Sequence, residues 1–299
     1  MKDTHPSRPH PPGALRFPGR EAMTLDRPRI MGVLNLTPDS FSDGGQFRDD
    51  SAAVARGLEM AQQGADLIDV GGESSRPGAQ RIGATEQIRR IGSVIRGLRE
   101  ALDQAGQAAT VISVDTTRAA VAEAALDAGA SMLNDISGGR EDPQMLGLAG
   151  QRSVPIVLMH MHGQPADMQR APRYDDVVAE IRAFLDRQAE AAAAGGVAAD
   201  QVVVDPGIGF GKTLEHNLAI LRALPSYVAA GRPVLLGTSR KSFLAKVLGD
   251  DRTKVEPPPG GGTAATTAVG VAAGVALFRV HDVALNRQVA DVAHRIHSG

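Results

Sequence analysis

Short apolar runs rich in β-branched residues alternate along the chain with Ala-rich or amphipathic stretches of helical length. Strands that are buried on both faces read as continuous apolar runs, and their alternation with helices implies parallel pairing through crossover connections. Eight such runs follow Arg29, at residues 30–34, 67–70, 111–114, 132–133, 156–159, 202–204, 234–236 and 275–278. The pattern predicts an α/β fold, most economically a closed (β/α)8 TIM barrel, which typically needs about 250 residues. A doubly wound open sheet is the alternative that the same pattern allows.

Glycines support this alternation because they stand where three predicted helices end. Residues 52–63 precede Gly64, residues 119–128 precede Gly129, and residues 175–194 precede a pair of glycines. A glycine at that position readily adopts the left-handed conformation that terminates a helix. Residues 255–262 contain three consecutive prolines followed by glycines, which predicts a linker or surface loop.

The beginning of the chain has a different composition. Residues 1–27 are rich in Pro, His and Arg and contain little that could form a core, so we expect a disordered N-terminal extension. Residues 28–299 would then form a single barrel domain, and Met23 is a candidate for the natural start of the chain. The extension has no apolar segment typical of a secretion signal, and no stretch elsewhere reaches membrane-spanning length. We therefore expect a soluble, cytoplasmic protein without a membrane partner.

Composition narrows the possible chemistry. The 299 residues include no cysteine, which excludes disulfide scaffolds, thiolate metal sites and cysteine nucleophiles. The formal net charge of -2 argues against nucleic acid as a partner. Catalysis must therefore use carboxylates, His, Lys, Arg, hydroxyls or a bound ion.

Polar residues stand at the end of nearly every apolar run. In a parallel barrel these ends converge on one face, so separate segments would build one polar site. A single Asp or Asn at such a point often only caps the next helix. Polar residues at essentially every strand end are harder to explain by capping. They are Asn35, Asp69, Glu73, Asp115, Asn134, Asp135, His160, Asp205, Ser239, Arg240, Lys241, Arg279 and His281.

Cationic residues near the last two strands suggest where an anion would bind. Residues 239–242 precede a predicted helix at 243–248, whose free backbone N–H groups favour a carboxylate or phosphate. Arg279 and His281 are alternate residues and would face the same way, so together with Arg76 they could hold a diphosphate. Residues 207–213 (GIGFGKT) are not a Walker phosphate loop, because Pro206 occupies the position of its first glycine.

The remaining polar groups suit a flat heterocycle. Asp115, Asn134 and Asp205 around Lys241 would supply donors and acceptors for a ring with amino and amide groups. Nucleobase-like and pterin-like rings both fit. Two loops rich in hydroxyl residues and glycine, at 37–45 and 71–78, could close over such a substrate.

Taken together, these segments resemble those of the dihydropteroate synthase family, and the resemblance covers nearly all of residues 29–296. Any one motif is weak, but the ordered set is highly specific. The segments are MGVLNLTPDSFSDG at 31–44, DVGGESSRPG at 69–78, SVDT at 113–116, NDI at 134–136, LMHM at 158–161, DPGIGFGK at 205–212, SRKS at 239–242 and RVHDV at 279–283.

The resemblance implies a TIM-barrel transferase of folate biosynthesis that is a target of sulfonamides. It would condense 6-hydroxymethyl-7,8-dihydropterin diphosphate with 4-aminobenzoate to give 7,8-dihydropteroate and diphosphate, with Mg2+ as cofactor. Diphosphate would depart ahead of amine attack, and no covalent enzyme nucleophile would be needed. Family members are commonly dimers, so the resemblance also implies a homodimer.

Residue roles follow from the same resemblance. The pterin-binding residues would be Asp115, Asn134, Asp205 and Lys241, with Met159 packed nearby; Asp115, Asp205 and Lys241 would also be the catalytic residues. Diphosphate would be bound by Asn35, Arg76, Arg279 and His281, with Asn35 also meeting Mg2+. The 4-aminobenzoate would be framed by Phe41, Ser75, Pro77, Phe210 and Ser239.

Two departures from the family pattern limit these implications. Ser75 stands where the family usually has Thr, which keeps the hydroxyl but loses a methyl group. Residues 257–262 are unusually rich in Pro and Gly for the loop before the last strand. A related methyltransferase-like barrel should lack the diphosphate-binding cations, and a non-catalytic pterin-binding paralogue should lack loop or lysine residues, whereas this chain has both sets.

Overall fold

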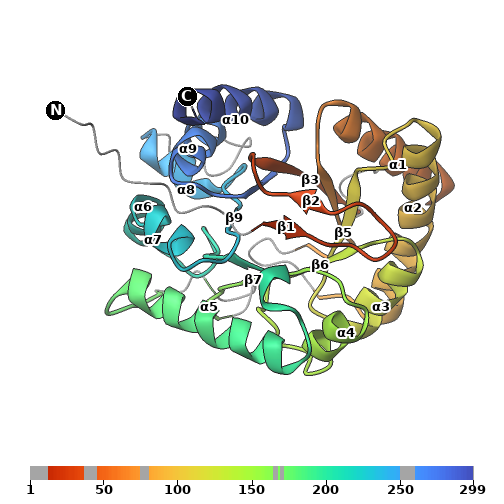
Figure 1. Cartoon of the computed structure of the whole chain (residues 1–299), viewed down its shortest axis with the longest axis horizontal. Helices are drawn as coiled ribbons and strands as arrows, with labels where there is room; N and C mark the ends of the chain where they lie inside the picture. Colours follow the sequence, from red (N-terminus) through yellow and green to blue (C-terminus); the bar gives the residue numbers. More distant parts are fainter. Residues whose placement is uncertain are drawn as a thin grey trace.

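In a computed structural model of the chain, the described residues are 13–36, 46–74, 81–163, 168, 172–249 and 260–298, with only the backbone described for 46–49. Their centre is an eight-stranded sheet surrounded by helices (Figure 1). The strands are β3 (Arg29–Asn35), β4 (Leu67–Gly71), β5 (Val111–Asp115), β6 (Met132–Asp135), β7 (Ile156–Met159), β8 (Val202–Asp205), β9 (Leu235–Leu236) and β10 (Leu277–Val280).

The sheet closes into a barrel. All of its ladders are parallel, and the hydrogen-bonded order is β8-β7-β6-β5-β4-β3-β10-β9. A bridge between Val204 and Val234 joins the two ends of that order, and the Val204 N–H donates to the Pro233 carbonyl at 2.9 Å. The prediction of a (β/α)8 TIM barrel is confirmed, and closure excludes the doubly wound open sheet.

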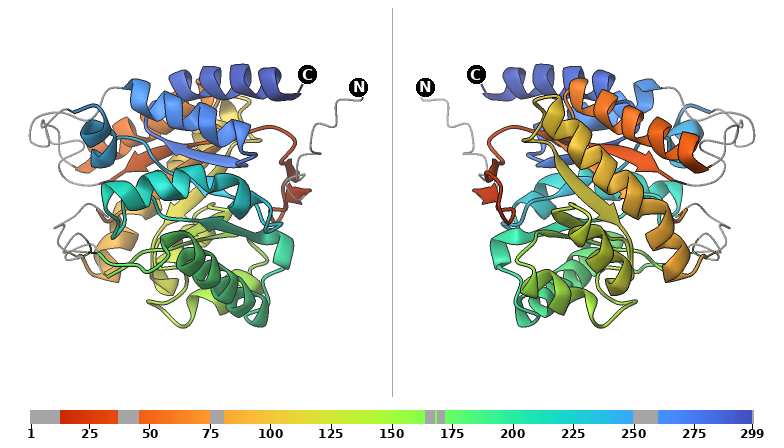
Figure 2. Two further views of the ribbon diagram at one scale, coloured as in Figure 1. Left: turned by 90° about the vertical axis from the view of Figure 1, so that its left-hand side faces the viewer. Right: turned by 90° about the vertical axis from the view of Figure 1, so that its right-hand side faces the viewer.

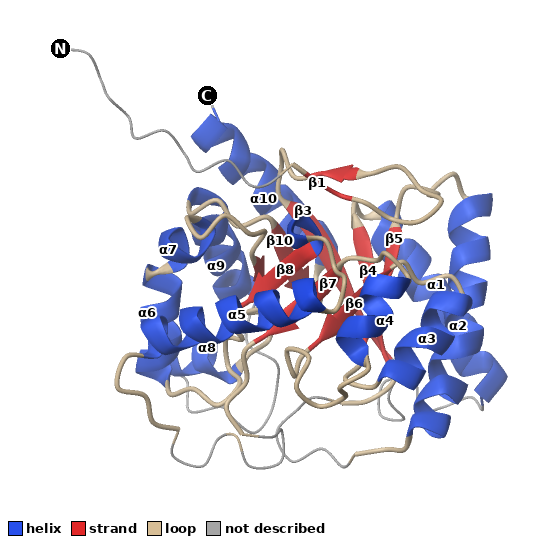
Figure 3. Ribbon diagram, turned by 60° about the horizontal axis from the view of Figure 1, so that its bottom comes forward, coloured by secondary structure: helices blue, strands red, loops and turns tan. Residues whose placement is uncertain are grey.

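Helices cover the outside of the barrel, as side views show (Figure 2; Figure 3). Gly64, Gly129 and Gly196 follow three of them with positive φ, as their capping role predicts. The helices are α1 (Gln46–Gln62), α2 (Ala84–Gln104), α3 (Ala119–Asp127), α4 (Met145–Gln151), α5 (Val177–Ala194), α6 (Leu214–Arg222), α7 (Leu224–Val228), α8 (Ser242–Val247), α9 (Gly260–Ala272) and α10 (Val283–Ser298). None of them is both long and apolar enough to cross a lipid bilayer.

One predicted loop is partly helical. Residues 255–259 lie outside the described residues, but residues 260–262 form the first turn of α9 rather than a linker. A Cβ on Gly260 would lie 3.0 Å from Leu285, and one on Gly262 would lie 3.4 Å from Leu244. Close packing of α9 against α10 and α8 thus outweighs the poor helix propensity of glycine.

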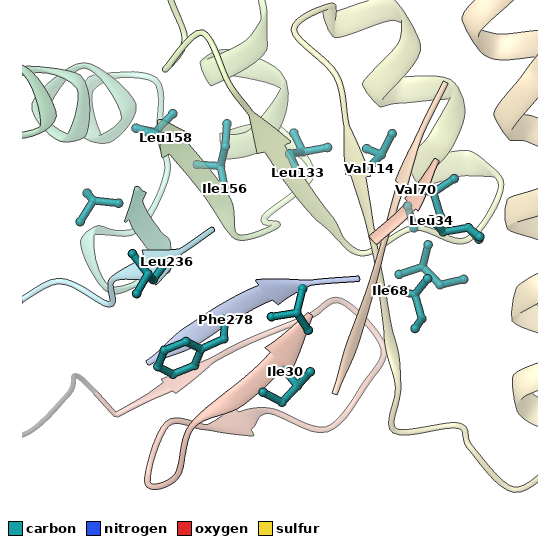
Figure 4. Packing of buried hydrophobic residues seen from close by; sticks show 14 of the residues in the cluster. Ile30, Leu34, Ile68, Val70, Val114, Leu133, Ile156, Leu158, Leu236 and Phe278 are labelled. Atoms are coloured by element: carbon teal, nitrogen blue, oxygen red, sulfur yellow. The ribbon is translucent and has the colours of Figure 1, made fainter. Parts of the chain in front are cut away.

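Alternate residues of each strand face two different cores. Those on the outer side pack against the helices, and ten of them are labelled in Figure 4, including Ile68 and Phe278. Those on the inner side fill the barrel with one apolar residue from each strand. These inner residues are Met31, Leu67, Val111, Met132, Val157, Val203, Leu235 and Leu277.

The N-terminal segment is more ordered than its composition predicts. Residues 1–12 lie outside the described residues, but β1 (Ala14–Leu15) and β2 (Met23–Thr24) pair as an antiparallel hairpin, so the expectation of disorder for 1–27 is wrong over 13–27. Leu15, Phe17 and Leu25 are buried in the inner apolar cluster. The hairpin therefore covers the amino-terminal end of the barrel and leaves the polar carboxyl end as the candidate site (Figure 1).

Candidate functional site

The polar residues at the carboxyl ends of the strands continue the inward-facing rows of the barrel. Asn35, Asp115 and Asp205 are the last residues of β3, β5 and β8, and each follows an inner apolar residue at even spacing along its strand. Asn134 and Arg279 have the same relation to Met132 and Leu277. The strand geometry thus brings together polar residues that are far apart in sequence.

An ion network lies in the centre of this site. Arg279 donates from Nε to Asp69 Oδ2 at 2.7 Å and from Nη2 to Asp115 Oδ2 at 2.8 Å. Asn134 Nδ2 donates to the same Oδ2 of Asp69 at 2.8 Å. Asp69 is fully buried, and within the part of the chain that the structure describes its Oδ1 has no hydrogen-bond partner. Asp69, which the sequence placed at a strand end without a role, therefore connects a predicted pterin-binding residue with a predicted diphosphate-binding residue.

This network orients the Asn134 side chain. An ionised carboxylate only accepts hydrogen bonds, so Asp69 requires the NH2 group of Asn134 to face it. The Asn134 Oδ1 atom is then the group left to accept from a ligand. Asp115 and Asp205 also offer carboxylate oxygens, so the site presents mainly acceptors.

Burial raises the pKa of two carboxyl groups in the site, those of Asp115 and Asp205. Burial raises the pKa of Asp115 to about 7, against the opposing effect of Arg279. Burial also raises the pKa of Asp205, while Lys241 acts in the other direction. Asp205 Oδ1 accepts from the Gly207 N–H at 2.7 Å, which holds the following loop against the strand.

Lys241 lies directly before α8 and points toward the loop that follows β8. Its Nζ donates to the Ile208 carbonyl and lies 4.5 Å from the centre of the Phe210 ring. Burial lowers the pKa of Lys241 to about 8, with Asp205 opposing the shift. Phe210 packs against a small cluster that contains Met159. The structure therefore brings Lys241, Asp205, Phe210 and Met159 together, as the predicted site requires.

Ser239 and His281 meet at the ends of β9 and β10. The His281 backbone N–H donates to Ser239 Oγ at 3.1 Å, and His281 Nδ1 lies 3.0 Å from the same oxygen. Ser239 is buried, so its hydroxyl helps to fix the position of His281. Four predicted site residues, Phe41, Ser75, Arg76 and Pro77, lie outside the described residues.

The donor set at the mouth of the barrel is suited to Mg2+ shared with a substrate. Among the described residues no group of three or more His, Cys, Asp or Glu side chains could hold a metal ion. Mg2+ is usually held by one or two protein oxygens, waters and substrate phosphates. Asn35 Oδ1 and Asp115 Oδ2 both lie beside Gly71. A Cβ placed on that glycine would be 3.6 Å from the Asn35 oxygen and 3.8 Å from the Asp115 oxygen. Asn35 thus offers a hard oxygen ligand close to a carboxylate.

Sequence reasoning missed a buried lysine beside the site. Lys212 is 3% exposed, and its Nζ lies 3.0 Å from His160 Nδ1 and donates to the Phe210 carbonyl at 3.0 Å. Lys212 was visible only as part of the GIGFGKT segment. No signal in the sequence indicated that its ammonium turns inward.

Comparisons with known proteins identify the family. The family model described as pterin binding enzyme matches residues 31–281. The chain is 48% identical to a dihydropteroate synthase of Mycobacterium leprae over 264 residues, which are 87% of this chain and 90% of that protein.

Solved structures give the same result. A Yersinia pestis dihydropteroate synthase in a sulfonamide drug complex has a TM-score of 0.86 and 37% identity, covering 96% of this chain and 100% of that one. A Xanthomonas albilineans dihydropteroate synthase with 4-aminobenzoic acid has a TM-score of 0.85 and 42% identity, covering 96% and 98%. A complex of the Xanthomonas albilineans enzyme with 7,8-dihydropteroate has a TM-score of 0.82 and 38% identity, covering 96% and 99%. The chain therefore belongs to the pterin-binding enzymes, in the dihydropteroate synthase family.

Proposed function

We propose that this protein condenses 6-hydroxymethyl-7,8-dihydropterin diphosphate with 4-aminobenzoate to form 7,8-dihydropteroate and diphosphate. The observation that carries the proposal is the network in which Arg279 bridges Asp69 and Asp115 beside Asn134. It places hydrogen-bond acceptors for a ring next to a cation for an anionic leaving group. The ligands named for the Xanthomonas albilineans structures, 4-aminobenzoic acid and 7,8-dihydropteroate, support the same reaction.

The pterin ring would bind among the acceptors of the barrel mouth. A carboxylate pairs bidentately with an amino-imine edge, which suits Asp115 or Asp205. The Asn134 carbonyl would accept from a further ring N–H, and Lys241 would donate to the ring carbonyl or a ring nitrogen. A ring with several N–H donors is therefore preferred over one that presents acceptors at the same positions.

Charge placement would favour departure of diphosphate. Cleavage of the C–O bond puts negative charge on the diphosphate and positive charge on the pterin methylene. Arg279 and His281 would stabilise the former, and the carboxylates of Asp115 and Asp205 the latter. The ion pairs of Arg279 use Nε and Nη2, so its Nη1 donors would meet the diphosphate. Arg76 would add a further cation by family correspondence.

Mg2+ would be held by Asn35 together with diphosphate oxygens. When bound, it would neutralise charge on the leaving group. The 4-aminobenzoate would lie against Phe210 and near Ser239, with Phe41, Ser75 and Pro77 completing its site by family correspondence. Ser75 lacks the methyl group of the usual Thr, so we expect a modest loss of contact there.

The family resemblance further supports a homodimer in the cytoplasm. Light scattering coupled to size-exclusion chromatography tests the assembly, since a homodimer would have twice the 31.2 kDa mass of one chain. A single species of one-chain mass at micromolar concentration would contradict the dimer.

The reaction is tested with purified protein, Mg2+, the pterin diphosphate and 4-aminobenzoate. We expect 7,8-dihydropteroate and diphosphate in equal amounts, and no product when EDTA removes Mg2+. The Asp115→Asn variant serves as a control for contaminating activity. Absence of product from a folded wild-type protein with Mg2+ would refute the proposed function, and full activity in EDTA would refute the metal requirement alone.

A further inference from the structure

The loop between β8 and α6, residues 207–213, is held by hydrogen bonds to both its N–H groups and its carbonyls. Asn217 Oδ1 accepts from the Gly209 N–H at 2.7 Å, and Tyr174 donates to the Gly211 carbonyl at 2.9 Å. The loop also packs tightly on the end of β7, because a Cβ on Gly207 would lie 1.9 Å from the His160 carbonyl oxygen. The loop is therefore a rigid support for the Phe210 side chain.

The Nζ group of Lys212 makes three contacts that join this loop to the end of β7. Its Nζ lies 3.0 Å from His160 Nδ1, 3.0 Å from the Phe210 carbonyl oxygen and 3.4 Å from the His160 carbonyl oxygen. A lysine ammonium has three N–H donors, and here it has three acceptors. No carboxylate oxygen lies within ion-pairing distance of Lys212 among the residues that the structure describes.

The His160 ring is in turn held in place by aromatic neighbours. It lies edge-on to Phe184, with ring centres 4.9 Å apart, and tilted to Tyr174 at 6.1 Å. Burial and the nearby Lys212 lower the pKa of His160 to about 2, so the neutral ring can accept at Nδ1. A fixed acceptor directly after β7 thus positions the Lys212 side chain.

Burial lowers the pKa of Lys212 well below its usual value, with Asp205 acting in the other direction. Burying this group without an ion-pairing carboxylate is costly, so a purely structural role would be met as well by an apolar side chain. Its hydrogen bonds instead join the end of β7, through the ring and carbonyl of His160, to the backbone carbonyl of Phe210. The Phe210 carbonyl accepts from Lys212, while the Phe210 ring lies over Lys241. Movement of this backbone would displace the ring from the site.

We propose that Lys212, held by His160, is a positioning residue that fixes Phe210 for binding of the arylamine substrate. This inference rests on the proposed function, in which Phe210 contacts 4-aminobenzoate. Three of the four predicted pterin-binding residues, Asp115, Asn134 and Asp205, are on strands, so their positions do not depend on the Lys212 contacts. The fourth, Lys241, precedes α8 and contacts the loop only at the Ile208 carbonyl and the Phe210 ring. Lys212 therefore contributes to recognition of one substrate and little to the other.

The test replaces Lys212 with Met, which keeps the length of the side chain and removes its donors. Steady-state kinetics with saturating Mg2+ should show a KM for 4-aminobenzoate that is about tenfold higher, the loss expected for hydrogen bonds from a charged donor. The KM for the pterin diphosphate should stay within about twofold of wild type. Hydrogen exchange should be faster for the amides of residues 207–211 than in wild type.

Three further proteins make the result decisive. Lys212→Gln keeps an amide donor and should give a KM for 4-aminobenzoate between those of wild type and Lys212→Met. Lys246→Met removes an exposed lysine of α8 and should behave as wild type. His160→Asn in combination with Lys212→Met should be no worse than Lys212→Met alone, because both residues act through one set of contacts.

The outcomes separate this inference from the proposed function. A wild-type protein that makes no dihydropteroate refutes the proposed function. An active wild type with an unchanged KM for 4-aminobenzoate in Lys212→Met, or equal increases in both KM values, overturns the role of Lys212. If Lys212→Met does not fold, an unchanged KM in Lys212→Gln overturns it instead.

Discussion

Asp69 offers a strong test of how the site is built, because one buried oxygen orients two functional side chains. Its Oδ2 accepts from Asn134 Nδ2 at 2.8 Å and from Arg279 Nε at 2.7 Å, and the residue is fully buried. Replacing Asp69 with Ala removes this oxygen, so Asn134 Nδ2 and Arg279 Nε both lose their acceptor. We expect both a loss of stability and weaker binding of the pterin.

The magnitude follows from these contacts. Breaking a buried ion pair by removing one partner costs about 3–5 kcal/mol, because the remaining charge stays buried. Arg279 keeps its second carboxylate, Asp115, so we expect about 3 kcal/mol, the lower end of that range. This loss is a large part of the roughly 5–15 kcal/mol by which a domain is usually stable.

The free energy of unfolding is measured by urea denaturation followed by circular dichroism, since the chain has no tryptophan to report on unfolding. Ser113→Ala is the matched control, because Ser113 pairs with Asp69 on the neighbouring strand and is equally buried, and its Oγ has no hydrogen-bond partner among the described residues. The Ser113→Ala substitution should lower the free energy of unfolding by less than about 1 kcal/mol. Asp69→Asn keeps the shape and one acceptor, so it should lie between wild type and Asp69→Ala.

Binding is measured in the same variants with a pterin that lacks the diphosphate. Asp69→Ala should weaken this binding about tenfold, because the Asn134 amide is no longer oriented. An Asp69→Ala protein that loses less than about 1 kcal/mol of stability and binds the pterin as wild type does would refute this reasoning.

Three further predictions concern the site and the end of the barrel opposite to it. Lys241 is a cation below its pKa of about 8, so kcat/KM should fall as pH rises through that value, and Lys241→Arg should move the fall above pH 10 in an activity profile. A fall at the same pH in Lys241→Arg would contradict this assignment. Asp115→Asn should lower kcat/KM about a hundredfold or more with little change in melting temperature, and wild-type rates would disprove its role. Phe17→Ala should cost about 3–5 kcal/mol of stability in urea denaturation, whereas Arg16→Ala, which removes an exposed residue paired with Asp200, should cost far less. Equal losses in these two variants would mean that the hairpin does not seal the barrel.

Local sequence determined much of this protein. Each of the eight apolar runs overlaps a strand, because a strand buried on both faces needs continuous apolar residues whatever its partners are, although β10 begins and ends two residues later than its run. Gly64 and Gly129 were identifiable as helix ends because a left-handed cap is a local requirement. The residues at the strand ends could also be named in advance, since parallel strands in a barrel deliver their ends to one face.

The tertiary structure decided which of these residues contact one another. Asp69 pairs with Arg279 across 210 positions of sequence, and only the pairing of β10 with β3, beside β4, makes that contact possible. Lys212 turns inward because the end of β7 offers His160 as an acceptor, which depends on the register between strands. Leu15 and Phe17 show no periodic pattern, and they are buried because the open end of the barrel exposes an apolar layer that they cover. Contacts of this kind depend on strand order and closure, which no short segment of sequence encodes.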